Sequence, residues 1–143
     1  MSTEDNKALV RRFYEEFCNK GDLKVADEIV LTDYAEHENV LGATSGRDGL
    51  KQFVTTTLAA FPDFHFTIED AIAEGNKVAV RLTARGTHRG PLGDIPPTGN
   101  QVANTAIVIF RITDGKIVER WGVADQLLLL QQLGVIPPMG QAS

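Results

Sequence analysis

The sequence is poor in the residues that most directly signal a chemical function. It contains 1 cysteine and 3 histidines among 143 residues. The single thiol, Cys18, cannot form an internal disulfide, and its place in the apolar stripe of a predicted helix indicates a small buried hydrophobe. The histidines lie too far apart in the sequence for metal-ligand spacing, so we predict no metal site. The sequence contains neither a phosphate-binding glycine loop nor a nucleophile elbow around a serine.

Excess positive charge and long apolar runs are missing as well. Lysine and arginine number 14 against 19 aspartate and glutamate, which gives a formal charge of −5. No basic cluster offers the electrostatic footprint that a phosphate backbone requires, which excludes nucleic acid as a partner. No apolar run approaches the roughly 20 residues of a membrane helix, and the acidic start MSTEDNKALVRR lacks the pattern of a signal peptide. We therefore expect a cytoplasmic protein, in a reducing compartment, with no membrane partner.

What is present fits one globular domain spanning residues 1–143. Hydrophobic residues make up 43% and charged residues 23% of the chain, and a chain of this length can bury a core without a disulfide. The apolar spacing is first helical and then alternating, which predicts helices at 3–20, 23–30 and about 47–60, an extended segment at 33–40, strands at 64–74, 78–88, 102–112 and 116–125, and a short final helix. Helices followed by hairpin-linked strands predict an α+β fold with a largely antiparallel sheet and helices on one of its faces.

The stretch 115–134, GKIVERWGVADQLLLLQQLG, carries the most informative polar residues. In a strand, residues two apart share a face, so Glu119, Trp121, Val123 and Asp125 are predicted to point the same way. An outward orientation makes them a solvated row, which the rarity of buried carboxylates favours. An inward orientation makes them the wall of a pocket with an acid at its end. The residues by themselves leave both orientations open.

Asp125 has two candidate roles where this strand meets the final helix. It lies at a strand end against the apolar run 127–130, and a carboxyl in partly apolar surroundings is suited to proton transfer. Aspartate is also a favoured N-cap residue, here for a helix that begins at Gln126. Both roles fit the sequence.

The histidines lie at or near predicted strands. His88 continues an apolar face that includes every second residue from 78 to 86, so we expect its side chain to point inward. His37 lies near the end of the extended segment, and His65 is predicted to point away from the core. A lone histidine at such positions is more often structural than catalytic.

Several separated motifs resemble the SnoaL-like polyketide cyclases. The match covers residues 10–134 in the order found in the family. Its most specific parts are GTHRG and ERWGVAD followed by QLG, and the remaining parts are VRRFYEE with NKGD, FPDF, PTG and DGKIVE.

The resemblance implies the cone-shaped fold of nuclear transport factor 2, in which a curved, mostly antiparallel sheet wraps the first helices around an apolar cavity, usually in a homodimer. It also implies that Glu119, Trp121 and Asp125 face the cavity. In the cyclases, an aspartate at the position of Asp125 is the acid/base of an intramolecular aldol ring closure that needs no metal or cofactor. His88 and His37 would polarise substrate oxygens.

The resemblance extends to the ligand, which we expect to be a small apolar, oxygenated molecule of the polyketide type. The residues expected to bind it are Trp121, Glu119, Tyr14, Phe13 and Phe53. Two other functions remain compatible with the sequence. One is a different hydrolase, isomerase or dehydratase reaction in the same fold, and the other is a small-ligand-binding module without catalysis.

Overall fold

The computed structural model describes residues 2–37 and 46–137. The helical elements are α1 (Thr3–Arg12), the π-helix η1 (Phe13–Cys18), α2 (Leu23–Ile29), α3 (Gly46–Ala60) and α4 (Gln126–Gln132). The strands are β1 (Val30–Glu36), β2 (His65–Glu74), β3 (Lys77–Thr87), β4 (Gln101–Thr113) and β5 (Lys116–Ala124). None of the helices in the described ranges has both the length and the apolar character needed to cross a membrane.

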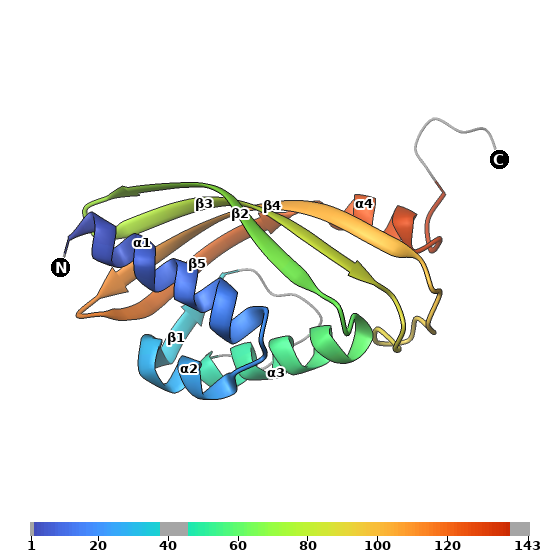
Figure 1. The fold of residues 1–143 in the computed structure, drawn as a ribbon, viewed down its shortest axis with the longest axis horizontal. Coiled ribbons are helices and arrows are strands. Elements are labelled where there is room, and N and C mark those ends of the chain that lie inside the picture. The colour runs from blue at the N-terminus through green and yellow to red at the C-terminus, as the bar shows by residue number, and fades with distance from the viewer. Residues whose placement is uncertain (1, 38–45, 138–143) are drawn as a thin grey trace.

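The strands form one sheet in the order β1-β5-β4-β3-β2. Strands β2 to β5 pair antiparallel with their neighbours, whereas β1 pairs parallel to β5. The sheet is curved, and α1, α2 and α3 lie on one side of it (Figure 1). We call this side the inner face and the opposite side the outer face. The predicted α+β fold, with a mostly antiparallel curved sheet around the first helices, is confirmed.

The first helix differs from the prediction of one continuous helix over residues 3–20. Ser2 and Asp5 form a capping box at the start of α1, but the turns from Phe13 onward widen into the π-helix η1. The wider turn places Phe13, Tyr14, Phe17 and Cys18 together in the core, where all four are buried. Packing against the sheet therefore decides the local geometry of this helix.

The side chain of Asn19 fastens the end of η1 to strand β2. It donates to the carbonyl oxygen of Phe66 at 3.0 Å and accepts from the Phe66 amide at 2.7 Å. Cys18, beside it, is buried, as predicted, and burial raises the pKa of its thiol to about 12. The thiol is therefore a packing group with little thiolate character.

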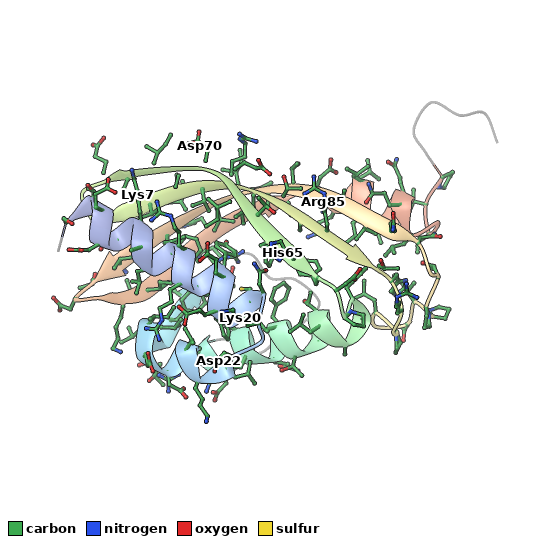
Figure 2. All side chains as sticks on the ribbon, in the orientation of Figure 1. Lys7, Lys20, Asp22, His65, Asp70 and Arg85 are labelled. Carbon is green, nitrogen blue, oxygen red and sulfur yellow. The ribbon has the colours of Figure 1, made fainter. Side chains whose placement is uncertain are left out.

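The core lies between the helices and the inner face of the sheet. Every second residue of β3 and β4 points inward, and Val78, Val80, Val108 and Phe110 are each at most 2% exposed. Phe110 contacts the rings of Phe13 and Tyr14 edge-on. The outer face is open by comparison, and Figure 2 shows Asp70 projecting from β2 on that side, whereas Lys20 and Asp22 lie among the helices.

Strand β1 begins earlier than predicted. The expected extended segment covered residues 33–40, but β1 starts at Val30, directly after α2, and residues 38–40 lie outside the described ranges. Val30 pairs with Ile117, and both are fully buried. The burial of this first residue, which the sequence shows only as the end of an apolar helix face, explains the earlier start.

Candidate functional site

An apolar pocket of about 590 Å³ opens between the inner face of the sheet and α3, the loop after β3, and α4. Most of its lining side chains are aliphatic or aromatic. They are Phe53, Phe61, Phe64, Phe66, Leu82, Ala84, Leu92, Ile95, Val102, Ala106, Val123, Ala124, Leu129 and Leu130. The residues Leu92 and Ile95 of the loop after β3 belong to this wall. A pocket of this size and character suits a small, mostly apolar molecule.

Strand β5 lines the pocket mainly with its even-numbered residues, joined by Val123, which is 77% exposed. Arg120, Gly122 and Ala124 line it, and their partners on β4 are Phe110, Val108 and Ala106. Cross-strand partners in an antiparallel pair share a face, and Phe110 and Val108 are fully buried in the core. The inner face of β5 is therefore its even-numbered one.

Glu119 and Trp121 lie on the outer face, which corrects the prediction that they face the cavity. Their partners on β4 are Arg111 and Ile109, and Ile109 is 39% exposed. The outward orientation, which the rarity of buried carboxylates favoured, is the observed one. The residues named for substrate binding at these two positions are therefore on the wrong side of the sheet to reach the apolar pocket.

His37 joins these two residues on the outer face and not in the cavity. Its ring stacks on Trp121 with centroids 5.1 Å apart and planes 9° from parallel. Its Nε2 lies 2.6 Å from Oε2 of Glu119, whose Oε1 accepts from Nε of Arg111 at 2.8 Å. The bond from Arg111, and then the one with His37, hold the pKa of Glu119 below its ordinary value. We call His37, Arg111, Glu119 and Trp121 the outer cluster.

Asp125 caps helix α4, the second of the two roles considered. Its Oδ1 accepts from the Leu128 amide at 2.9 Å. The side chain is exposed, in contrast to the partly apolar surroundings expected from the adjacent leucines. Its chain neighbours Ala124 and Gln126 both line the pocket, so Asp125 lies at the rim. The cap occupies one carboxylate oxygen, and the other remains available for chemistry.

His88 is completely buried, as its position on the inner face of β3 predicts. The Thr98 amide donates to its Nδ1 at 3.2 Å, and the Thr98 hydroxyl lies 3.0 Å from the same nitrogen. Because Nδ1 accepts, the neutral ring carries its proton on Nε2. Within the described ranges, Nε2 is buried without a hydrogen-bond partner. The ring packs 5.2 Å from Phe61, a residue of the pocket wall, so His88 lies next to the pocket without lining it.

Two sequence motifs hold His88 in place. The carboxylate of Asp63 accepts from the Thr87 amide at 2.7 Å and from the Thr87 hydroxyl at 2.8 Å, and these bonds lower the pKa of Asp63. The Gly90 amide donates to the Ala60 carbonyl, and a Cβ at Gly90 would lie 2.1 Å from the Ala59 oxygen. Only glycine fits this approach, so the GTHRG and FPDF motifs join the end of β3 to the end of α3.

The three aromatic residues named for substrate binding are divided between pocket and core. Phe53 lines the pocket. Phe13 and Tyr14 lie in the core, where Tyr14 packs 5.0 Å from Phe66, a residue of the pocket wall. They can thus shape the pocket only through the residues that they support.

Sequence reasoning missed a polar pair at the pocket. The Nη1 of Arg120 donates to Oε1 of Glu36 at 2.7 Å, and the hydroxyl of Tyr34 donates to the other carboxylate oxygen. Burial raises the pKa of Tyr34, so its hydroxyl stays protonated and donating. The pattern that could have predicted this pair is Arg120, Gly122 and Ala124, every second residue of β5. The two small residues leave space on that strand face beside the long arginine side chain.

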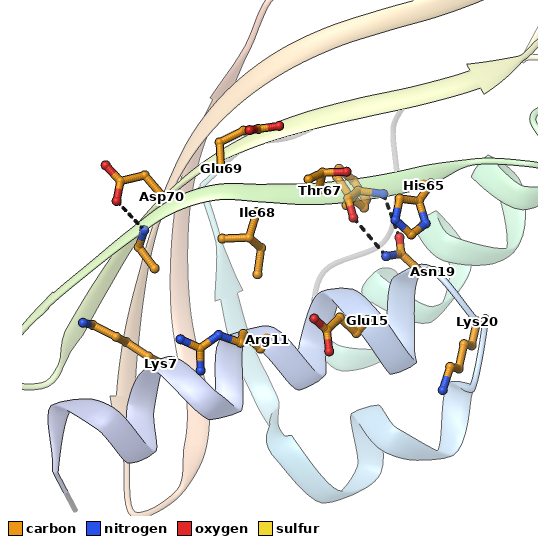
Figure 3. A pocket seen from close by; sticks show the side chains of 12 residues that line it. Lys7, Arg11, Glu15, Asn19, Lys20, His65, Thr67, Ile68, Glu69 and Asp70 are labelled. Carbon is orange, nitrogen blue, oxygen red and sulfur yellow. Dashed lines mark hydrogen bonds between the residues drawn. The ribbon is translucent and has the colours of Figure 1, made fainter.

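A second hollow, the polar groove, lies between α1 and β2 (Figure 3). Lys7, Arg11 and Glu15 face it from the first helices, and Glu69 and Asp70 border it on β2. Its wall mixes both signs of charge, and none of the site residues predicted from the sequence lies there. Among residues 2–37 and 46–137, no three His, Cys, Asp or Glu side chains come together as a potential metal site.

The comparisons with known proteins agree with this architecture. The family model of the SnoaL-like polyketide cyclases matches residues 8–133. The chain therefore belongs to the SnoaL-like polyketide cyclase family, and its fold is the cone-shaped α+β fold of that family. A curated relative, the aklanonic acid methyl ester cyclase DauD of Streptomyces sp. (strain C5), is 32% identical over 132 residues, covering 88% of this chain and 80% of its own.

Solved structures show the same fold. TsrD from Streptomyces laurentii superposes with a TM-score of 0.86 at 26% identity, covering 95% of this chain and 99% of its own. IdmH from Streptomyces antibioticus, a proposed polyketide cyclase, superposes with a TM-score of 0.80 at 33% identity, covering 91% of this chain and 99% of its own. The likeness extends over nearly the whole of each chain.

Proposed function

We infer that this protein is a cofactor-independent cyclase that closes a ring by an intramolecular aldol-type reaction on a polyketide-like substrate. The observation that carries the proposal is the apolar pocket, with an aspartate at its rim and one charged side chain, Arg120, in its described wall. The family and the name of the curated relative support the same chemistry. The substrate is expected to be mostly apolar and to carry carbonyl oxygens.

In the proposed reaction, Asp125 removes a proton next to a carbonyl group and later returns it. The oxygen of Asp125 that does not cap α4 is available for this transfer, and the leucines of α4 shield the pocket from water. His88, with its proton on Nε2, can donate to a substrate oxygen if Phe61 moves aside. His37, Glu119 and Trp121 have no part in the proposal because they lie on the outer face.

The experiment that tests this proposal uses aklanonic acid methyl ester, the compound in the name of the curated relative, as substrate. Asp125→Asn keeps a capping side chain but removes the base, so we expect turnover to fall about 10²- to 10⁴-fold with little change in unfolding free energy. A kinetic pKa present in the wild type should disappear in the variant. Asp22→Asn is the matched control because Asp22 caps α2 by a bond to the Lys24 amide and does not line the pocket.

Full turnover by Asp125→Asn would show that Asp125 is only a cap. An equal loss in Asp22→Asn would attribute the effect to helix capping in general. A wild type that binds the ester without converting it would favour the binding-module alternative.

We also propose that two copies of the chain pair through the outer face. Ile72, Ile107 and Val123 are 65%, 59% and 77% exposed there, and Ile109 is 39% exposed. Ile72, Ala79, Ile109 and Trp121 are consecutive cross-strand partners, so an apolar row crosses the sheet from β2 to β5. A contiguous apolar row on an open sheet face is typical of a protein interface. The cytoplasmic location stays a prediction from the sequence.

A further inference from the structure

Arg120 is the one ionisable side chain among the described residues that line the apolar pocket. Its side chain is 15% exposed, and the surrounding wall is aliphatic and aromatic. A guanidinium stays protonated at any working pH. A charge in surroundings that exclude most water acts at a lower effective dielectric than one on the surface, so its attraction for an anion is stronger.

Hydrogen bonds that involve two residues of β1 fix the position of the Arg120 guanidinium. The Nη1 of Arg120 donates to Oε1 of Glu36 at 2.7 Å, and Tyr34 donates to Oε2 of the same carboxylate. Glu36 and Arg120 are direct partners in the parallel pairing of β1 with β5, so the backbone register itself brings them together. The side chain of Glu36 is 20% exposed, and Tyr34 is buried. The result is a guanidinium held at the pocket wall by a half-buried carboxylate and a buried tyrosine.

We propose that Arg120 binds a negatively charged oxygen of the ligand, and that Glu36 is a positioning residue for the guanidinium. This inference deepens the proposed function and rests on it for its role in the reaction. Removal of a proton next to a carbonyl group moves negative charge onto the oxygen, and a fixed cation at that point stabilises the enolate. The ligand therefore places its negatively charged oxygen against Arg120 and its apolar body along α3 and α4.

A binding experiment tests this assignment without any turnover. The probes are 1-anilinonaphthalene-8-sulfonate, which is anionic, and N-phenyl-1-naphthylamine, which has the same rings without the sulfonate. Dissociation constants for both are measured by fluorescence titration. We expect the wild type to prefer the anion, and Arg120→Gln to weaken anion binding by about tenfold or more while the neutral probe binds as before.

Three variants make the result specific. Arg85→Gln, an exposed position on β3, removes the same charge elsewhere and should leave both constants unchanged. The double variant Arg120→Gln/Glu36→Gln removes both charges, so it avoids a lone buried carboxylate if Arg120→Gln alone does not fold. Ala124→Phe narrows the pocket and should weaken both probes.

Glu36→Gln separates positioning from simple packing. It keeps a side chain of the same shape but removes the charge that competes for the guanidinium. The anionic probe should then bind several-fold more tightly, with the neutral probe unchanged, whereas a purely structural role predicts no gain. Unchanged preference for the anion in Arg120→Gln or its double variant, or binding of either probe that Ala124→Phe leaves unaffected, would overturn the proposal. Loss of turnover in Asp125→Asn does not enter this measurement, so the two proposals fail independently.

Discussion

The two faces of strand β5 differ in the volume of their side chains where the strand borders the pocket. The inner face presents Arg120, Gly122 and Ala124 to the apolar pocket. The outer face presents Glu119 and Trp121, and Trp121 has the largest apolar side chain of the strand. The small residues Gly122 and Ala124 on the inner face leave space for a ligand. A side chain as large as Trp121 on that face would fill this space. The comparison teaches that a cavity is marked by missing side-chain volume.

Polar residues follow the same division. On the inner face, Arg120 is satisfied by Glu36, a carboxylate from the neighbouring strand, in surroundings with little water. On the outer face, Glu119 is satisfied by Arg111 and His37. The two glutamates are equally exposed, at 20%, so the faces differ in the cations: Arg120 is 15% exposed, whereas Arg111 is 37% and His37 43% exposed. An exposed ion pair contributes little because water screens it, while a buried one acts strongly on its surroundings. Arginine–glutamate pairs on the two faces of the sheet therefore differ in how strongly water screens their charges.

The largest expected difference between the faces is in stability. Phe110→Ala removes a fully buried ring between the helices and the sheet, and we expect a loss of about 3–5 kcal/mol in unfolding free energy. Ile109→Ala, the next residue along β4 and 39% exposed on the outer face, should cost under about 1 kcal/mol.

Urea unfolding of both variants at several protein concentrations is the measurement. Any contribution of a dimer to Ile109→Ala appears as a dependence of the midpoint on concentration and can be separated. Equal losses in the two variants at low concentration would show that the two faces are covered alike, contrary to the structure.

The next effect concerns association through the outer face. The wild type should sediment at twice the 15.6 kDa monomer mass at micromolar concentration. Ile107→Lys places a charge on each side of a two-fold interface, so the dissociation constant should rise by about tenfold or more. Thr55→Lys adds the same charge to an exposed position of α3 and is the control. A wild-type monomer under these conditions would refute the dimer.

The smallest expected effect is the pH dependence of the outer cluster. Bonds from Arg111 and His37 lower the pKa of Glu119, so the folded state binds its proton less tightly than the unfolded state. The stabilisation is therefore present above the unfolded pKa and is lost as the pH falls through the folded one. Glu119→Gln should be less stable than the wild type at about pH 7, and the difference should narrow as the pH falls towards about 3.

Unfolding curves for the two proteins over this pH range are the measurement. Glu74→Gln changes an exposed carboxylate at the end of β2 and should show no such convergence. A difference between wild type and Glu119→Gln that persists unchanged to low pH would mean that the glutamate acts through packing and not through its charge.

Much of the fold was predictable because its signals are local. Apolar spacing located three helices and four strands to within a few residues, and the alternation along β3 placed His88 inside. The cap role of Asp125 was also predictable, since an aspartate directly before a helix accepts a bond from the first turn. The π-helix at Phe13 was not, because packing against Phe110 and Phe66 widens a turn that the sequence presents as ordinary helix.

The site was predicted less well than the fold. Phe53 lines the pocket and His88 lies beside it, but Glu119, Trp121 and His37 were assigned to the wrong face. The reason is the period of two in a strand, since one wrong choice of face moves every residue that depends on it. The alternation in a strand predicts which residues share a face, but it does not predict which of the two faces is buried.

The sequence by itself determined most of the helices and strands, the family, and the burial of Cys18 and His88, because each depends on neighbouring residues or on a contiguous motif. Only the tertiary structure decided which face of β5 forms the pocket, since that depends on where the helices pack. It also brought Glu36 to Arg120, 84 residues further along the chain, through the register of β1 on β5. A contact over that distance follows from strand pairing, which no local pattern specifies.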